Sequence, residues 1–232
     1  MKTAHIFISL LLILSFTLLF SLTYSKNSKS VSTPVLNKPK IIIDAGHGSP
    51  DGGTQTPDGT LEKDLNLAIA KKIALLCDLN SIDYIMTRTT DDCIADKSAE
   101  TIRQKKISDT KNRLKIINDN PQAIYLSVHQ NYFSDQKYSG AQVFYSKNNP
   151  MSSVLAETVQ KQIVELLQPQ NYRIAKPTGT EIYLLYHAKN TAIMVECGFL
   201  SNPKEAELLK SEEYQNKMAF AVFCGILKYL EA

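Results

Sequence analysis

Four ionisable side chains, spread widely along the chain, have the types needed for metal-assisted hydrolysis: His47, Glu62, His129 and Glu196. Two imidazoles and one carboxylate form a common ligand set for catalytic zinc, with water in the open position. Bound zinc lowers the pKa of that water and polarises a carbonyl group. A second carboxylate that is not a ligand can take the proton of the water and pass it to a leaving nitrogen. The four residues therefore have the parts for hydrolysis of an amide bond.

The residue types alone leave alternatives open. Either Glu62 or Glu196 fits the role of the third ligand, because both offer a carboxylate at a predicted element boundary. A structural metal, or no metal at all, is also consistent with the spacing, because the sequence has no compact His-Glu-x-x-His motif.

Strands and helices alternate along the body of the chain. Short apolar runs predict strands at 40–45, 82–88, 122–128, 140–145 and 191–195. Apolar residues at helical spacing predict helices at 61–79, 99–118, 154–166 and 214–229. This alternation predicts a single α/β domain of three layers, in which a mostly parallel sheet carries helices on both faces.

The predicted sheet places the four ionisable residues at one edge. His47 comes just after the first strand, His129 ends the third and Glu196 ends the fifth. Glu62 stands at the start of the first helix. Because sites in such sheets lie outside the carboxyl ends of the strands, we expect these side chains to converge there.

Composition and charge exclude several classes of protein. The chain has 232 residues, of which 44% are hydrophobic and 21% charged, so wholesale disorder is excluded. The formal net charge of +3 argues against a mainly electrostatic nucleic-acid binder. Four cysteines without a Cys-x-x-Cys pair indicate neither a disulfide-stapled scaffold nor a zinc finger.

The first residues predict export. Residues 6–24 carry no charge and lie between Lys2 and Lys26. We interpret residues 1–25 as a signal peptide or an N-terminal membrane anchor, residues 26–39 as a linker and residues 40–232 as the catalytic domain. Either interpretation places the body of the chain outside the cytoplasmic membrane, with membrane contact only through the N-terminal segment.

Four sequence blocks in order resemble those of the zinc-dependent N-acetylmuramoyl-L-alanine amidases of the Amidase_3 type. They are Ile-Asp-Ala-Gly-His-Gly-Ser-Pro-Asp-Gly-Gly at 43–53, Leu-Glu-Lys-Asp at 61–64, Leu-Ser-Val-His-Gln-Asn at 126–131 and Val-Glu-Cys-Gly-Phe-Leu-Ser-Asn at 195–202. Met-Thr-Arg at 86–88 matches a further strand-end signature, and the resemblance covers about residues 40–232.

The resemblance implies a role for each of the four residues. His47, Glu62 and His129 match the ligands of one zinc ion with an activated water, and Glu196 matches the catalytic glutamate. The implied fold is phosphorylase/hydrolase-like. The implied substrate is peptidoglycan, cleaved between the lactyl carbonyl of N-acetylmuramic acid and the amine of L-alanine.

Compactness makes the chain most similar to the germination-specific amidases of spore formers. Only about ten residues separate His129 from the next predicted strand, too few for the site-blocking helix of large division amidases. This resemblance implies removal of stem peptides from spore cortex, in the cortex or intermembrane space. A partner deacetylase would then form muramic-δ-lactam, and a spore lipoprotein would be an accessory partner.

Other functions remain as alternatives. A vegetative cell-wall autolysin would share the whole site, and a zinc peptidase of another specificity would differ only in its leaving group. A non-catalytic peptidoglycan-binding module would usually have lost a ligand, and a structural zinc protein should close its site with a fourth ligand.

Three further residues carry expectations. Arg113 matches a family arginine and could hold a carboxylate of the peptide, support a ligand, or form a surface ion pair. Asp44 could bond the second nitrogen of a ligand histidine or cap a loop. Cys197 follows Glu196 in a predicted strand, where neighbouring side chains point to opposite faces, so we expect its thiol behind the site.

Overall fold

The computed structural model describes residues 40–231. The expected leader (1–25) and linker (26–39) lie outside these described residues. Within residues 40–231, no helix combines the length and apolar character that a membrane span requires.

A six-stranded sheet forms the centre of the described part of the chain. Its order is β2-β1-β3-β6-β4-β5, and every neighbouring pair is parallel except β4 with β6. The strands are β1 (Ile41–Ala45), β2 (Tyr84–Met86), β3 (Ile124–Asn131), β4 (Gln142–Tyr145), β5 (Lys176–Pro177) and β6 (Ala192–Phe199).

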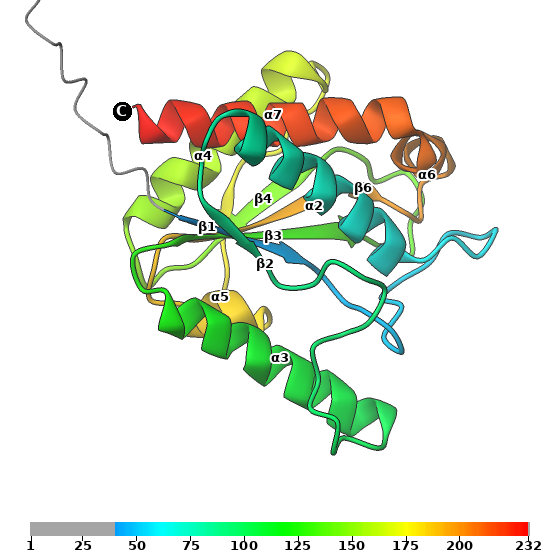
Figure 1. Cartoon of the computed structure of the whole chain (residues 1–232). Coiled ribbons are helices and arrows are strands. Elements are labelled where there is room, and N and C mark those ends of the chain that lie inside the picture. Colours follow the sequence, from blue (N-terminus) through cyan, green and yellow to red (C-terminus); the bar gives the residue numbers. More distant parts are fainter. Residues whose placement is uncertain (1–39, 232) are drawn as a thin grey trace, which may run out of the picture. The chain divides into compact units, whose positions relative to one another are not determined.

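Helices cover both faces of this sheet, as Figure 1 shows. One face carries α2 (Glu62–Leu79), α4 (Met151–Leu166) and α7 (Glu212–Leu230). The other carries α3 (Ile102–Asp119) and α5 (Tyr183–His187), and α6 (Pro203–Lys210) follows β6. The predicted three-layer α/β domain with a mostly parallel sheet is thus confirmed.

Burial on both faces explains the continuous apolar run of β1. Ile41 and Ile43 belong to the core beneath α2, α4 and α7, whereas Ile42 belongs to the smaller core on the α3 and α5 face. All five residues of β1 are buried. A strand in this position cannot alternate apolar and polar side chains, because neither face meets water.

The sequence patterns do not predict three short elements, and they predict two strands that are shorter than the observed ones. β5, α5 and α6 have two, five and eight residues, too few for a recognisable period. β3 and β6 continue past the predicted ends at 128 and 195, because they remain paired through an irregular register to Asn131 and Phe199. His129 and Glu196 therefore lie within strands rather than at their ends.

Candidate active site

The ends of β1 and β3 and the start of α2 bring three of the four predicted residues together. One donor atom from each of His47, Glu62 and His129 lies within 4.8 Å of the others. Nε2 of His47 is 3.2 Å from Oε1 of Glu62, and Nδ1 of His129 is 2.9 Å from the same oxygen. The two imidazole rings meet edge to face, with centroids 5.0 Å apart.

Backbone amides hold the Glu62 carboxylate. Thr54 N–H donates to Oε2 over 2.9 Å, and Gln130 N–H donates to Oε1 over 3.2 Å. Burial disfavours the charged carboxylate, but the hydrogen bonds and charges of His129 and His47 outweigh it and hold the pKa of Glu62 well below its usual range. Glu62 therefore faces the two histidines as an anion.

Asp51 orients His47. Its Oδ2 is 2.9 Å from Nδ1 of His47, which leaves Nε2 directed at Glu62. Burial disfavours the charged imidazole, but the hydrogen bonds of Asp51 and Glu62 raise the pKa of His47 to about 9. A metal cation at Nε2 would take the place of the proton that this pKa describes. The prediction that Asp44 bonds a ligand histidine is wrong, because Asp51 occupies that position.

Glu196 lies beside this cluster on the neighbouring strand. Its register partner on β3 is His129. Oε2 of Glu196 is buried and, among the described residues, has no hydrogen-bond partner. Burial, with the Glu62 carboxylate adding to it, raises the pKa of Glu196 to about 7, against the opposing charges of His129 and His47. An orphaned carboxylate with a pKa near neutrality has the properties of a general base.

The donor set of His47, Glu62 and His129 fits a zinc ion. Two imidazole nitrogens and one carboxylate oxygen are typical zinc ligands, and zinc–ligand bonds at tetrahedral angles place donor atoms about 3.3 Å apart. The observed separations of 3.2 and 2.9 Å to Oε1 of Glu62 are close to that spacing, and all three donor atoms lie within 4.8 Å of one another. Both histidine side chains remain about one-fifth to one-quarter exposed, so a substrate group can reach the site.

Two glycines allow the backbone to pack directly against the side chains of the site. A Cβ on Gly46 would lie 2.3 Å from Nε2 of His129. Gly53 has φ of 71°, and a Cβ there would lie 2.5 Å from Oε2 of Glu62. Only a residue without a side chain permits both this backbone conformation and this approach.

Gly53→Ala is therefore expected to weaken zinc binding at least about tenfold, as loss of ligand orientation does. Titration with zinc against a chromophoric chelator measures the affinity. Gly59→Ala is the matched control, because Gly59 also has positive φ (89°) but no atom of the described residues lies within 4 Å of its added Cβ. Equal zinc affinities of the two variants would contradict the steric argument.

Arg113 is buried, so the interpretations as a peptide-binding residue or a surface ion pair are wrong. Its side chain is 3% exposed and pairs with Asp44 and Asp109. It also donates to the carbonyl oxygens of Ala45 (2.9 Å) and His47 (2.6 Å). Arg113 thus supports the backbone of the His47 loop.

Arg88 supports the same loop. Its guanidinium donates to the carbonyl oxygens of Ala45 (3.0 Å), Gly46 (3.1 Å) and Lys63 (2.7 Å). His47 has φ of 61°, which is unfavourable for a residue with a Cβ. The two arginines therefore stabilise a strained loop. Arg88 belongs to the Met-Thr-Arg signature, whereas nothing in the sequence pattern singled out the supporting role of Asp51.

Cys197 lies behind the site, as its place in the strand predicted. The residue is fully buried, and burial raises the pKa of its thiol far above the usual range. A thiol held in this state is a poor metal ligand.

Comparisons with known proteins agree with this geometry. Residues 41–228 match the Amidase_3 family model, described as N-acetylmuramoyl-L-alanine amidase. The chain is 34% identical over 213 residues to the germination-specific N-acetylmuramoyl-L-alanine amidase of Bacillus subtilis (strain 168), across 91% of this chain and 88% of that protein.

Solved structures show the same fold. The CwlD amidase from Clostridioides difficile, in complex with the GerS lipoprotein, gives a TM-score of 0.80 at 40% identity, covering 83% of this chain and 98% of that one. An N-acetylmuramoyl-L-alanine amidase from Clostridium difficile 630 gives 0.72 at 30% identity, covering 84% and 98%. The chain therefore belongs to the Amidase_3 family of N-acetylmuramoyl-L-alanine amidases and is an enzyme that acts on peptidoglycan.

Proposed function

We propose that the chain is a zinc-dependent amidase that hydrolyses the bond between N-acetylmuramic acid and L-alanine, with His47, Glu62 and His129 as zinc ligands and Glu196 as general base and acid. The observation that carries this assignment is the buried Oε2 of Glu196, on the strand beside His129, which has no hydrogen-bond partner within residues 40–231. A buried polar atom without a partner is rare and indicates a functional contact.

The chemistry divides between the metal and the protein. Zinc, when bound, lowers the pKa of a water molecule and polarises the lactyl carbonyl group. Glu196 accepts a proton from the attacking water as the water oxygen bonds to the carbonyl carbon. As the carbon–nitrogen bond breaks, Glu196 returns that proton to the nitrogen of L-alanine. The products are a free lactyl carboxylate and a free L-alanine amine.

Product analysis tests the bond and the metal together. Purified protein is incubated with peptidoglycan, and the released peptides are identified by mass spectrometry. We expect stem peptides that begin at L-alanine, lost with a chelator and restored by zinc. Cleavage within the peptide would instead identify a zinc peptidase of another specificity, and chelator-resistant release would refute zinc dependence.

We also propose that the substrate in the cell is spore cortex, outside the cytoplasmic membrane. The similarity to a germination-specific amidase supports this assignment. Removal of stem peptides would expose muramic acid for a deacetylase that leads to muramic-δ-lactam. The solved structure of the CwlD amidase from Clostridioides difficile contains that amidase in complex with the GerS lipoprotein. By analogy, we propose a spore lipoprotein as an accessory partner of this chain.

Complementation tests the cortex role. The chain is expressed in a Bacillus subtilis strain that lacks its germination-specific amidase, and cortex muropeptides are separated by chromatography. We expect muramic-δ-lactam to return with the wild-type chain and not with Glu196→Gln. A chain that is active on vegetative wall but restores no lactam, with or without a coexpressed lipoprotein, would be a general autolysin.

A further inference from the structure

A row of side chains continues from Glu196 across the sheet. Glu196 is the register partner of His129 on β3 and of Gln142 on β4. Register partners on neighbouring strands point to the same face, and the strands are about 4.8 Å apart. Gln142 therefore lies one strand beyond Glu196, on the same face as the proposed catalytic carboxylate.

Arg173 extends this row by one more residue. It precedes β5, and because β5 is parallel to β4, both begin at the edge where β4 carries Gln142. Nη1 of Arg173 donates to Oε1 of Gln142 over 3.0 Å, and Nε donates to the carbonyl oxygen of Ser139 over 2.7 Å. The guanidinium also lies 4.7 Å from the centre of the Phe199 ring. Three contacts therefore fix its position.

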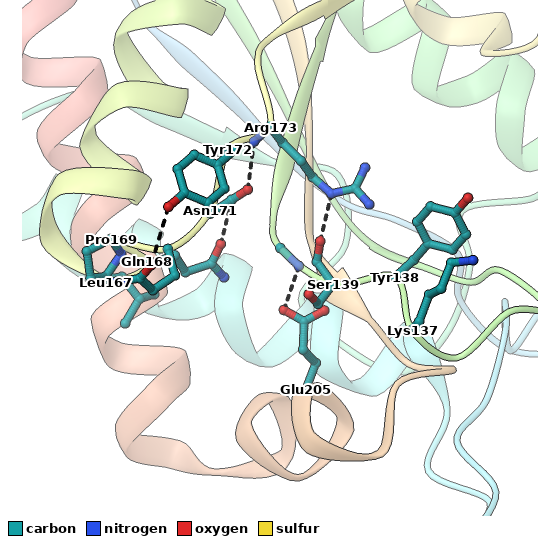
Figure 2. Close-up of a pocket in the computed structure, with 12 residues that line it drawn as sticks. Lys137, Tyr138, Ser139, Leu167, Gln168, Pro169, Asn171, Tyr172, Arg173 and Glu205 are labelled. Carbon is teal, nitrogen blue, oxygen red and sulfur yellow. Dashed lines mark hydrogen bonds between the residues drawn. The ribbon is translucent and has the colours of Figure 1, made fainter.

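This guanidinium opens into a groove of about 650 Å³. Figure 2 shows it directed away from Asn171 and Tyr172, toward the side formed by Ser139 and Tyr138. The neighbouring acid in the groove, Glu205, is otherwise engaged: its oxygens accept from the amides of Gly140 (2.9 Å) and Phe199 (2.8 Å).

Arg173 retains donors that no described residue uses. A guanidinium has five N–H groups, and Ser139 and Gln142 take two of them. Within residues 40–231 it forms no ion pair, unlike the buried Arg113. A fixed cation with free, adjacent N–H groups matches a carboxylate, which guanidinium groups bind through paired hydrogen bonds.

We propose that Arg173 binds a carboxylate on the peptide leaving group and so makes the enzyme specific for acidic stem peptides. This proposal rests on the function proposed above. In the proposed mechanism, Glu196 returns its proton to the L-alanine nitrogen. The guanidinium of Arg173 is separated from Glu196 by one strand spacing and one side-chain hydrogen bond, which places it roughly 8–10 Å from Glu196. An extended peptide spans about 3.5 Å per residue, so the carboxylate belongs to the residue after L-alanine.

Two matched substrates test this specificity. They are N-acetylmuramoyl-L-alanyl-D-glutamate derivatives whose γ-carboxyl group is capped as the N-methylamide in both, and whose α-group is either a free carboxylate or a carboxamide. We expect the wild-type enzyme to favour the carboxylate at least about tenfold in kcat/KM, and Arg173→Gln to reduce that preference to near unity. Lys137→Gln is the control, since it removes an exposed charge from the same groove and should retain the preference.

The outcomes separate the subsite from the proposed function. An Arg173→Gln variant that keeps the preference, or a wild-type enzyme without one, would overturn the proposal. If the wild-type enzyme cleaves neither substrate, the proposed function fails. Calorimetry with L-alanyl-D-glutamate then tests whether Arg173 binds the peptide. Tenfold weaker binding to Arg173→Gln than to Lys137→Gln supports the proposed carboxylate subsite, and equal binding refutes it.

Discussion

We expect Glu196→Gln to lower kcat about a hundredfold to ten-thousandfold, the loss typical of a missing general base, while the zinc content stays at the wild-type level. The amide keeps the size and position of the carboxylate but cannot accept a proton from water. Because Glu196 lies outside the His47–Glu62–His129 donor cluster, a zinc ion held by that cluster would keep its proposed ligands. Steady-state kinetics with a soluble muramoyl peptide and metal analysis of the same sample measure the two quantities.

Two controls make this result specific. His129→Ala removes one donor of the cluster and should lose both zinc and turnover. Glu207→Gln makes the same chemical change at an exposed surface ion pair with Lys210 and should leave both at the wild-type level. Retention of most activity in Glu196→Gln would refute the general-base role, and loss of zinc would make Glu196 a ligand.

We expect Arg113→Met to destabilise the folded protein by about 3–5 kcal/mol, because it leaves a buried carboxylate without its cation. The side chains of Arg113 and Asp44 are 3% and 1% exposed. Asp44 also accepts hydrogen bonds from Tyr125 (2.7 Å), Ser127 (2.6 Å) and Thr87 (2.8 Å), so its charge cannot relax toward water. Chemical denaturation near pH 7 measures the free energy of unfolding.

An arginine on the same helix provides the control. Arg103 is exposed on α3, and Arg103→Met should change the free energy of unfolding by less than about 0.5 kcal/mol. The double variant Asp44→Asn/Arg113→Met should lose less stability than the sum of the single variants, because neither partner is left charged and alone. Additive losses would show that the pair does not interact.

The same pair predicts an acid dependence of stability. Burial disfavours the charged form of Asp44, but Arg113, Ser127 and Tyr125 outweigh it and hold the pKa of Asp44 below its usual range. The folded protein therefore binds fewer protons here than the unfolded chain. The contribution is complete above the unfolded pKa of about 3.9 and is lost as the pH falls below it. The double variant should lose less stability than the wild-type protein on acidification.

Sequence patterns were sufficient to predict the main strands and helices and the edge where the site lies. Continuous apolar runs predict β1 and β3 because both faces of each strand are covered, and helical spacing predicts α2, whose first residue is Glu62. With the strand-end rule, these elements bring His47, Glu62 and His129 together. The assignment of Glu62 as a metal ligand and of Glu196 as the catalytic carboxylate came from the resemblance to known amidases. Residue chemistry alone did not distinguish the two glutamates.

Only the tertiary structure decided which side chains support those residues. Asp44 was a candidate partner for a histidine, yet it pairs with Arg113, 69 residues away, while Asp51 holds His47. Arg173 carries no sequence signal, because its neighbours Ser139 and Gln142 come from another loop and another strand. Hydrophobic periodicity reports which face of an element is buried. Hydrogen-bond partners instead depend on strand register and loop path, which form only when distant segments pack.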